Sequence, residues 1–245
     1  MEAYVVQKYL SDPLLIGHKK FDLRIYVLVT SYRPLIVYIY RSGFARFTNS
    51  RYCNSKTNLD DASMHLTNAA IQKKEHRTEY GAGNDLKWRI RSMKLYLISQ
   101  FGEQRVNRLF KEINDAIIGS LIAVKSVMIH DKHCFELYGY DIMIDRHLKA
   151  WLIEANAAPS FTASSDDDRL LKFSVLSDCL DVVTSSQPKG QQLTVGGFDL
   201  VYNDGNVEYH QRCLVTSHLG CNNVSMEKYR KIIRRVKKAK KGKPL

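Results

Sequence analysis

Polar and apolar residues alternate along the first fifty positions of the chain, and this period of two predicts β-strands. We predict four strands here, over Tyr4–Leu10, Phe21–Thr30, Leu35–Tyr40 and Phe44–Phe47. Turn-forming residues, Asp12-Pro13 and Tyr32-Arg33-Pro34, separate the first three. Within the second strand, Asp22, Arg24 and Tyr26 should point to one face of the sheet, and the apolar residues between them to the other.

The pattern changes after this region. Residues 48–92 are polar and rich in Asn, Ser, Asp and Gly, so we expect a long loop. Between Met93 and Ile129 apolar residues recur every three or four positions, which predicts a short helix and a long one separated at Gly102. A further helix is predicted from Asp166 to Val183. Residues 185–222 are mixed in pattern.

A predicted β-hairpin gathers polar side chains on one face. Its two strands, joined by a turn over Arg146–Lys149, are Glu136–Asp145 and Ala150–Asn156. If Asp145 faces Ala150 across the turn, Asp141 lies directly opposite Glu154. Asn156 shares the face of Glu154, because side chains two residues apart on a strand point the same way. Two carboxylates and an amide should therefore meet on one patch.

Oxygen donors gathered in this way suit Mg²⁺, which takes one or two carboxylates and leaves room for substrate phosphates. We therefore predict Asp141, Glu154 and Asn156 as metal ligands. The alternative is an amphipathic hairpin whose acids face solvent. Because like charges that face each other destabilise a strand pair, a cationic group should separate the two acids in either case.

Taken together, the predicted elements indicate an α+β fold, with an antiparallel sheet backed by the long helix. At 245 residues the chain is long enough for one full domain. No apolar run approaches 18 residues, and the N-terminus shows no basic stretch followed by an apolar block, so we predict neither a membrane span nor a secretory signal.

The positive charge of the chain is concentrated at its C-terminal end. Residues 226–245 hold ten Lys or Arg and one Glu, which is +9 of the net charge of +12. We expect this segment to be a helical basic tail that attracts a polyanion such as nucleic acid, an anionic membrane or an acidic protein tail. No aromatic residues interleave its lysines as base stacking requires, so nucleic acid is not the expected partner.

Five scattered cysteines fit reduced thiols in a cytosolic protein better than a disulfide framework. Four zinc-type ligands do occur within twelve residues, at His210, Cys213, His218 and Cys221. Their spacing matches no zinc motif that we can justify, so we do not predict zinc there.

Further charged and polar residues gather near the predicted sheet. Lys20, Asp22 and Arg24 lie on or beside the second strand, and Arg46 lies at the end of the fourth. Thr67-Asn68 sits in the long loop and, taken alone, is typical of a helix cap. Acids that hold a metal beside Arg and Lys are the arrangement expected around a nucleoside triphosphate.

Several of these segments occur, in the same order, in tubulin tyrosine ligase-like proteins, which are ATP-grasp amino-acid ligases. The matching segments are Gln7–Leu10, Lys20–Arg24, Phe44–Arg46, His65–Asn68, Tyr138–Asp141 and Trp151–Ser160. The resemblance covers roughly residues 4–183, and the segments at 196–200 and 218–221 make the chain similar to the polyglutamylase branch.

The resemblance implies a role for each candidate residue. The backbone of Gln7, Lys8, Tyr9 and Leu10 would form the hinge that reads the adenine edge. Lys20 and Asp22 would contact the nucleotide, and Thr67 and Asn68 would line the same cleft. Arg24 and Arg46 would face the phosphates or the developing acyl phosphate, as catalytic residues. Asp141, Glu154 and Asn156 would hold Mg²⁺.

The implied reaction is ATP-dependent addition of free glutamate to glutamate side chains in the C-terminal tails of tubulin. The implied partners are tubulin or microtubules, with no membrane. The implied location is the cytoplasm and cytoskeleton, including the axoneme or basal body of a cilium or flagellum. Residues 1–185 would be the C-terminal part of an ATP-grasp fold that begins at the adenine hinge, 186–225 a family-specific extension and 226–245 the basic tail.

The chain departs from this family in one respect. ATP-grasp enzymes also use a glycine-rich flap and lysines that precede the hinge, and we find no such segment in these 245 residues. We therefore expect a truncated form that lacks ligase activity on its own. A non-catalytic module that binds microtubules or another partner through the basic tail stays open as the alternative.

Overall fold

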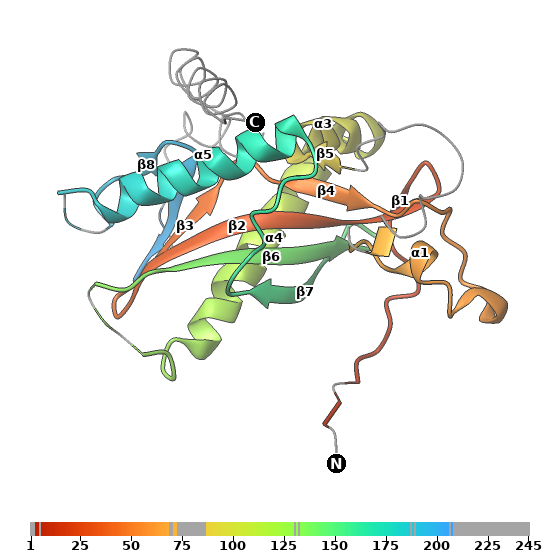
Figure 1. Ribbon diagram of the computed structural model, residues 1–245, viewed down its shortest axis with the longest axis horizontal. Helices are drawn as coiled ribbons and strands as arrows, with labels where there is room; N and C mark the ends of the chain where they lie inside the picture. Colours follow the sequence, from red (N-terminus) through yellow and green to blue (C-terminus); the bar gives the residue numbers. More distant parts are fainter. Residues whose placement is uncertain are drawn as a thin grey trace, which may run out of the picture.

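The computed structural model describes residues 3–207, apart from 5, 69–70, 73–86, 130, 132, 187, 189 and 206. Nine antiparallel strands form one curled sheet within these residues (Figure 1). The strands are β1 Leu15–Ile16, β2 Lys19–Tyr32, β3 Leu35–Tyr40, β4 Phe44–Phe47, β5 Lys87–Arg89, β6 Glu136–Ile144, β7 Ala150–Asn156, β8 Thr194–Val195 and β9 Phe198–Asn203. The helices are η1 Lys56–Asn58, α1 Ala62–His65, α3 Ile90–Phe101, α4 Glu103–Val124 and α5 Asp166–Val183. The predicted α+β class is confirmed.

Strand β2 is the centre of the sheet. Its 14 residues are buried almost throughout. On one side its first half pairs with β4 and its second half with β3, while β6 pairs along the other side. Strand β7 follows β6 outward, β5 extends β4, and β9 and β8 extend β3. Residues from distant parts of the chain therefore meet around β2.

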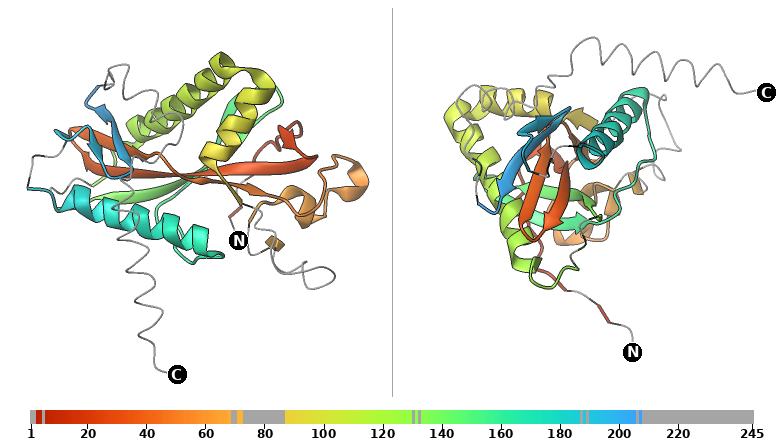
Figure 2. Two further views of the ribbon diagram at one scale, coloured as in Figure 1. Left: turned by 90° about the horizontal axis from the view of Figure 1, so that it is seen from above. Right: turned by 90° about the vertical axis from the view of Figure 1, so that its left-hand side faces the viewer.

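Helices cover both faces of the sheet, α3 and α4 on one and α5 on the other (Figure 2). The face toward α4 carries Leu23, Ile25 and Val27, which belong to the larger apolar cluster. Tyr26 and Leu28 point the other way and pack in the smaller cluster beneath α5. The alternation predicted for this strand is confirmed. The second helical layer was not predicted.

Gly102 separates α3 from α4, as predicted. It ends α3 with a bond from its amide to the carbonyl of Ile98 at 2.9 Å, and its φ of 82° is a conformation that a side chain disfavours. Helix α4 then buries an apolar stripe against the sheet, including Val106, Leu109 and Ile113. Ser165 caps the N-terminus of helix α5, since its side chain accepts a bond from the amide of Asp168, and the helix has the predicted bounds, Asp166–Val183.

The β6–β7 hairpin has the predicted facing pair but a different turn. Asp141 lies opposite Glu154, whereas Ala150 lies opposite Ile144 and not opposite Asp145. The carboxylate of Asp145 instead accepts bonds from amides in the loop and from the indole of Trp151 at 2.9 Å. The pairing shifts by one residue between Asp141 and Ile142, so a bulge in β7 restores the predicted pair.

Other predictions for the elements need correction. The described part of residues 4–10 forms no strand, and the first short strand lies at Leu15–Ile16 instead. The region 48–92 is not all loop, since it holds η1, α1, β5 and the start of α3. Strands β8 and β9 lie within the stretch that we left unassigned. The basic tail and the four candidate zinc ligands lie outside the described residues.

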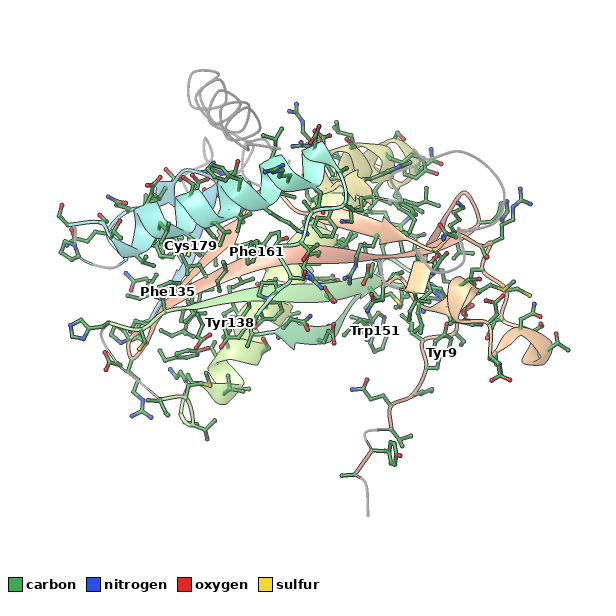
Figure 3. All side chains as sticks on the ribbon, in the orientation of Figure 1. Tyr9, Phe135, Tyr138, Trp151, Phe161 and Cys179 are labelled. Atoms are coloured by element: carbon green, nitrogen blue, oxygen red, sulfur yellow. The ribbon has the colours of Figure 1, made fainter. Side chains whose placement is uncertain are left out.

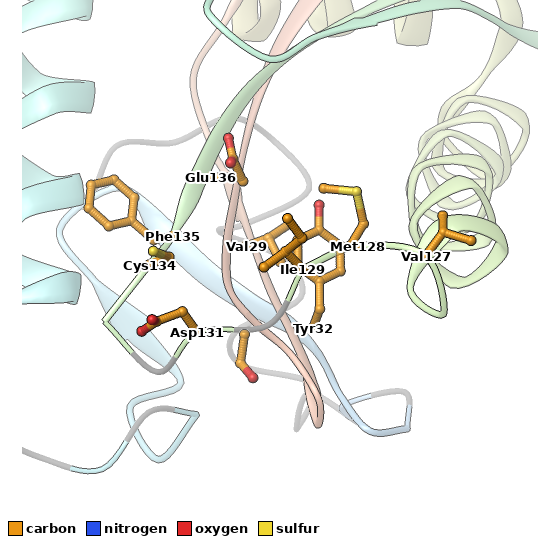
Figure 4. Close-up of a pocket in the computed structure, with 10 residues that line it drawn as sticks. Val29, Tyr32, Val127, Met128, Ile129, Asp131, Cys134, Phe135 and Glu136 are labelled. Atoms are coloured by element: carbon orange, nitrogen blue, oxygen red, sulfur yellow. The ribbon is translucent and has the colours of Figure 1, made fainter.

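Among the described residues, no helix is long and apolar enough to cross a membrane. A cavity of about 350 Å³ lies at the end of the sheet where β2 finishes and β6 begins (Figure 4). Its lining is mostly apolar, with Val29, Met128 and Phe135, and its charged groups, Asp131 and Glu136, are acidic. It is formed at the opposite end of β2 from Asp22 and Arg24, so it is distinct from the site described next.

Candidate functional site

Strand pairing brings the predicted site residues into two rows on the α5 face of the sheet. Directly paired residues in antiparallel strands point to the same face. One row runs over β5, β4 and β2, and the other over β2, β6 and β7. The rows are Lys87, Arg46 and Asp22, and Arg24, Asp141 and Glu154. Helix α5 begins beyond these rows, so its first turn borders them.

Two arginines and two aspartates form a linked network at the junction of the rows. Arg24 binds Asp141 with both ends of its guanidinium, Nε to Oδ1 at 2.5 Å and Nη2 to Oδ2 at 3.0 Å. Arg46 binds Asp22, with Nε to Oδ1 at 2.8 Å, and also reaches Asp141 Oδ2 at 2.7 Å. Two guanidinium groups therefore bind Asp141, but neither contacts Glu154 among the described interactions, so the cation expected between these two facing acids stays a prediction. Bidentate pairs of this kind fix both partners in one geometry.

Burial and hydrogen bonding act in opposite directions on Asp141, which is 3% exposed. Burial alone raises the pKa of its carboxyl. The hydrogen bonds from Arg24 and the charge of Arg46 outweigh this effect and hold the pKa below its usual value. Asp141 therefore stays ionised at neutral pH, as a metal ligand or an ion-pair partner must.

The donor set at the end of this row is compatible with Mg²⁺. Glu154 is exposed, and Asn156 Nδ2 donates to its Oε1 at 2.9 Å, which leaves the amide oxygen of Asn156 available. Asp141 Oδ1 accepts one described bond and retains a lone pair. Among the described residues, no three His, Cys, Asp or Glu side chains are grouped so that they could hold a metal ion by themselves. A cation here would therefore need the amide oxygen and further ligands such as water or phosphate.

A second polar cluster joins Lys20 to Tyr9, which lies on the segment that precedes the sheet and is labelled in Figure 3. Lys20 Nζ donates to Tyr9 Oη at 3.1 Å and to the carbonyl of His65 at 2.8 Å. Tyr9 Oη in turn lies 2.8 Å from His65 Nδ1. Burial lowers the pKa of Lys20 to about 8. Among the described residues of the predicted hinge, the side chain of Tyr9 thus contacts a second predicted site residue, Lys20.

The remaining predicted residues lie at the border of the site. Gln7 and Lys8 are exposed and Leu10 is half-buried, in a segment without regular structure. Thr67 is half-buried. The carbonyl of Asn68 accepts bonds from two amides, three and four residues later, each at 3.1 Å, as at the start of a helical turn. These residues adjoin the anchored His65, but their contact with a nucleotide stays a prediction.

Three charged residues at this site were missed by the sequence reasoning. Lys87 Nζ and Lys172 Nζ both bind Asp168 Oδ2, at 2.8 and 3.2 Å. Lys87 was assigned to a loop. Asp168 and Lys172 could have been found from the sequence, because they are four residues apart on the buried stripe of the predicted helix, and buried charged residues are rarely unpaired.

The α5 face of the sheet therefore has an excess of positive charge. Among the buried and half-buried residues described around the two rows, five are cations and three are acids, while Glu154, a fourth acid, is exposed. The cations are Lys20, Arg24, Arg46, Lys87 and Lys172, and the acids are Asp22, Asp141 and Asp168. Because unbalanced buried charge is costly, this surface suits a polyanionic ligand.

The fold is a mixed domain of helices and a curled antiparallel sheet, which is consistent with an ATP-grasp-like domain. The model of the tubulin-tyrosine ligase family matches residues 1–192. The chain belongs to this family.

Individual relatives agree with that assignment. A probable tubulin polyglutamylase TTLL9 from Bos taurus is 44% identical over 98% of this chain and 54% of its own length. A probable alpha-tubulin polyglutamylase Ttll1 from Tetrahymena thermophila is 44% identical over 83% of the chain and 51% of its own length. The tubulin polyglutamylase TTLL5 from Mus musculus is 39% identical over 74% of the chain and 14% of its own length. The chain thus spans about half the length of the first two.

Proposed function

We propose that this chain carries the nucleotide- and metal-binding part of an ATP-dependent ligase that adds glutamate to glutamate side chains in the C-terminal tails of tubulin. The observation that carries the proposal is the buried network of Arg24 and Arg46 with Asp22 and Asp141, next to the exposed oxygens of Glu154. The names of the relatives supply the substrate class.

Each residue has a role that its position supports. Lys20 and Asp22 contact the nucleotide, and the backbone of residues 7–10 with Thr67 and Asn68 lines the adenine end of the cleft. Arg24 and Arg46 present fixed guanidinium groups to the phosphoryl group in transfer. Glu154 and Asn156, together with Asp141, hold Mg²⁺, which when bound supplies positive charge against the phosphate oxygens.

The reaction requires little covalent help from the protein. The γ-carboxylate of a tail glutamate attacks the terminal phosphorus of ATP, giving an acyl phosphate and ADP. The amine of free glutamate then attacks the acyl carbon and loses a proton, phosphate leaves, and an isopeptide bond forms. Arg24 and Arg46 stabilise the negative charge that develops in both steps, and they are held in place before the substrates arrive. That preorganisation is the contribution of the Asp22 and Asp141 carboxylates.

The location and partners follow from this proposal. The enzyme would act on microtubules of the cytoplasm and cytoskeleton, including those of the axoneme or basal body. The basic tail at 226–245, with ten Lys or Arg, suits the polyanionic tails of tubulin. The tail also supports the second candidate function, a module that binds microtubules without catalysis. Removal of residues 226–245, with co-sedimentation against microtubules and against RNA, distinguishes a tubulin partner from a nucleic acid.

Incorporation of radiolabelled glutamate into microtubules tests the proposed reaction. Because the chain spans about half of the bovine relative, the assay uses both the chain alone and a chimaera that adds the part of that relative outside the match. We expect incorporation by the chimaera, no measurable incorporation by the chain alone, and loss of activity in the chimaera on Glu154→Gln. Glu112→Gln, an exposed acid on α4, is the matched control and should leave activity unchanged. Equal activity of the Glu154→Gln and Glu112→Gln chimaeras would contradict the assignment of the metal site.

A further inference from the structure

Helix α5 has apolar side chains on both of its sides, but the described residues cover only one of them. Leu171 and Val175 are buried against the sheet, in the smaller apolar cluster. Phe173, Leu176 and Leu180 lie on the outer side of the helix and are 38%, 40% and 56% exposed. Among the described elements, none covers this outer side (Figure 2). A helix that is apolar on all sides is normally covered on all sides, so the outer side of α5 calls for a partner.

The three exposed residues form one continuous stripe, which we call the outer stripe. Positions 173, 176 and 180 are three and four residues apart, so their side chains follow one face of the helix. Most of the exposed charged residues of α5 are acidic, and they are Asp166, Asp167 and Asp181, with Arg169 as the one cation. Asp167 is also bound by Arg89, at 3.1 Å. A segment with an apolar side flanked by basic residues is therefore complementary to this surface.

The basic tail carries this complementary pattern in its sequence. Tyr229, Ile232, Ile233 and Val236 recur at steps of three and four residues, as in a helix with one apolar side, and we call them the tail stripe. The tail stripe is as long, from its first residue to its last, as the outer stripe. Residues 226–245 hold ten Lys or Arg and one Glu, so the tail is opposite in charge to the outer side of α5.

The described part of the chain ends beside α5. Its last residue, Val207, packs against the apolar cluster that contains Leu171 and Val175 of this helix, and its amide donates to the carbonyl of Val201 at 3.3 Å. Residues 208–225 reach up to about 60 Å when extended. Helix α5 has 18 residues, which at 1.5 Å per residue is about 27 Å. The basic tail is therefore within reach of every position on the outer stripe.

We propose that the tail stripe docks on the outer stripe of α5 within the same molecule. The contact covers exposed apolar side chains on both segments and places lysines and arginines beside Asp166 and Asp181. Lys231, Arg234 and Lys238 share the opposite side of the tail by the same spacing, so they face away from α5. The docked tail thus presents a fixed basic surface to a polyanionic partner, next to the candidate site that the first turn of α5 borders. The docking does not depend on the proposed ligase reaction, because it concerns only contacts inside the chain.

Cross-linking of the full chain with a carbodiimide tests the docking, because this reagent joins a carboxylate to an amine that contacts it. Asp181 is exposed, and mass spectrometry of the wild-type protein should find peptides that link it to a lysine of the tail. We expect Leu176→Ser and Ile233→Ser each to lower the yield of this link by about fivefold, since each removes apolar area from the contact. The double variant should lower the yield little further, because both changes act on one contact.

Ile122→Ser is the matched control. Ile122 is 40% exposed, as Leu176 is, but it lies on α4, which covers the other face of the sheet. Its replacement should leave the yield of the link unchanged. Equal yields from the wild-type protein and Leu176→Ser would overturn the proposal, as would the absence of any link between α5 and the tail.

A mixture of ordinary and isotope-labelled chains distinguishes docking within one molecule from docking between two. Links that stay within one label, with a yield independent of protein concentration, support the proposal. Links that join the two labels mean that a second copy covers the outer stripe, and they overturn it.

Digestion with trypsin measures the same contact without a cross-linker, because the tail offers ten Lys or Arg for cleavage. Cleavage within the tail should be slower in the wild-type protein and in Ile122→Ser than in Leu176→Ser. Equal rates in all three proteins would contradict the docking.

Discussion

Replacement of Asp141 by Asn tests whether the charge network holds the site together. The side chain of Asp141 is 4% exposed, and its two oxygens bind Arg24 and Arg46. Asn keeps the shape of Asp but removes the negative charge. Arg46 retains Asp22, whereas Arg24, whose side chain is 10% exposed, loses its bidentate partner. The variant therefore leaves a buried guanidinium without a counter-charge.

Removal of one partner of a buried ion pair lowers the free energy of unfolding by about 3–5 kcal/mol. For a domain of this size about 1 kcal/mol corresponds to roughly 2–4 °C in Tm, so we expect Tm to fall by about 10 °C. Glu154→Gln is the matched control, because Glu154 faces Asp141 across the hairpin but is exposed. It should change the free energy of unfolding by no more than about 0.5 kcal/mol while it weakens Mg²⁺ binding.

The pH dependence gives a second measurement on the same pair of proteins. The pKa of Asp141 is lowered in the folded state, so its contribution to stability is complete above the unfolded value near 4 and is lost as pH falls through the folded pKa. The difference in stability between wild type and Asp141→Asn should therefore narrow in acid. Urea unfolding at pH 7 and below pH 4 measures it. A loss at pH 7 of less than about 1 kcal/mol would refute the view that Asp141 neutralises a buried guanidinium.

Two further predictions concern the same face of the sheet. In Gly139→Ala the added methyl group would lie 2.8 Å from Pro159 Cβ and 3.1 Å from Arg24 Cδ. We therefore expect the free energy of unfolding, measured in urea, to fall by about 1–3 kcal/mol. The control Gly119→Ala adds its methyl group in open space on a helix, so stability should be unchanged or higher. Because the pKa of Lys20 is about 8, Lys20 loses its positive charge as pH rises through 8, and binding of Mg·ADP should weaken. The variant Lys20→Arg keeps its charge and should bind Mg·ADP equally at pH 7 and pH 9. Equal binding by the wild-type protein at both pH values would contradict the role of Lys20.

The local pattern was sufficient for elements whose burial follows a simple period. Strands Leu35–Tyr40 and Phe44–Phe47 and the helix Asp166–Val183 have the bounds predicted. Tyr4–Leu10 also alternates, yet it forms no strand, because a strand needs a neighbouring strand to accept its hydrogen bonds and none lies beside it among the described residues. Strands β5, β8 and β9 were missed because they lie in stretches of polar or mixed pattern, where pairing with the neighbouring strands of the sheet stabilises them.

The part of the candidate site on the β6–β7 hairpin could be predicted, because it depends on the alternation of side chains along two adjacent strands. The facing of Asp141 and Glu154 follows from alternation, although a bulge in β7 that no local signal predicts is needed to produce it. The approach of Arg46 to Asp141, across the whole width of β2, depends on which strands are neighbours. Sequence patterns carry no such information, because strand order is decided by packing of the complete sheet.

The sequence by itself thus determined the α+β class, most of the elements, the acids and arginines of the site, and the family resemblance. These follow from side-chain chemistry and from the periods of strands and helices, which are local properties. Only the tertiary structure decided that α5 covers the second face of the sheet, that two guanidinium groups bind Asp141, and that Lys87 reaches Asp168. Those contacts join residues far apart in the chain, and they exist only once the sheet and helices have packed together.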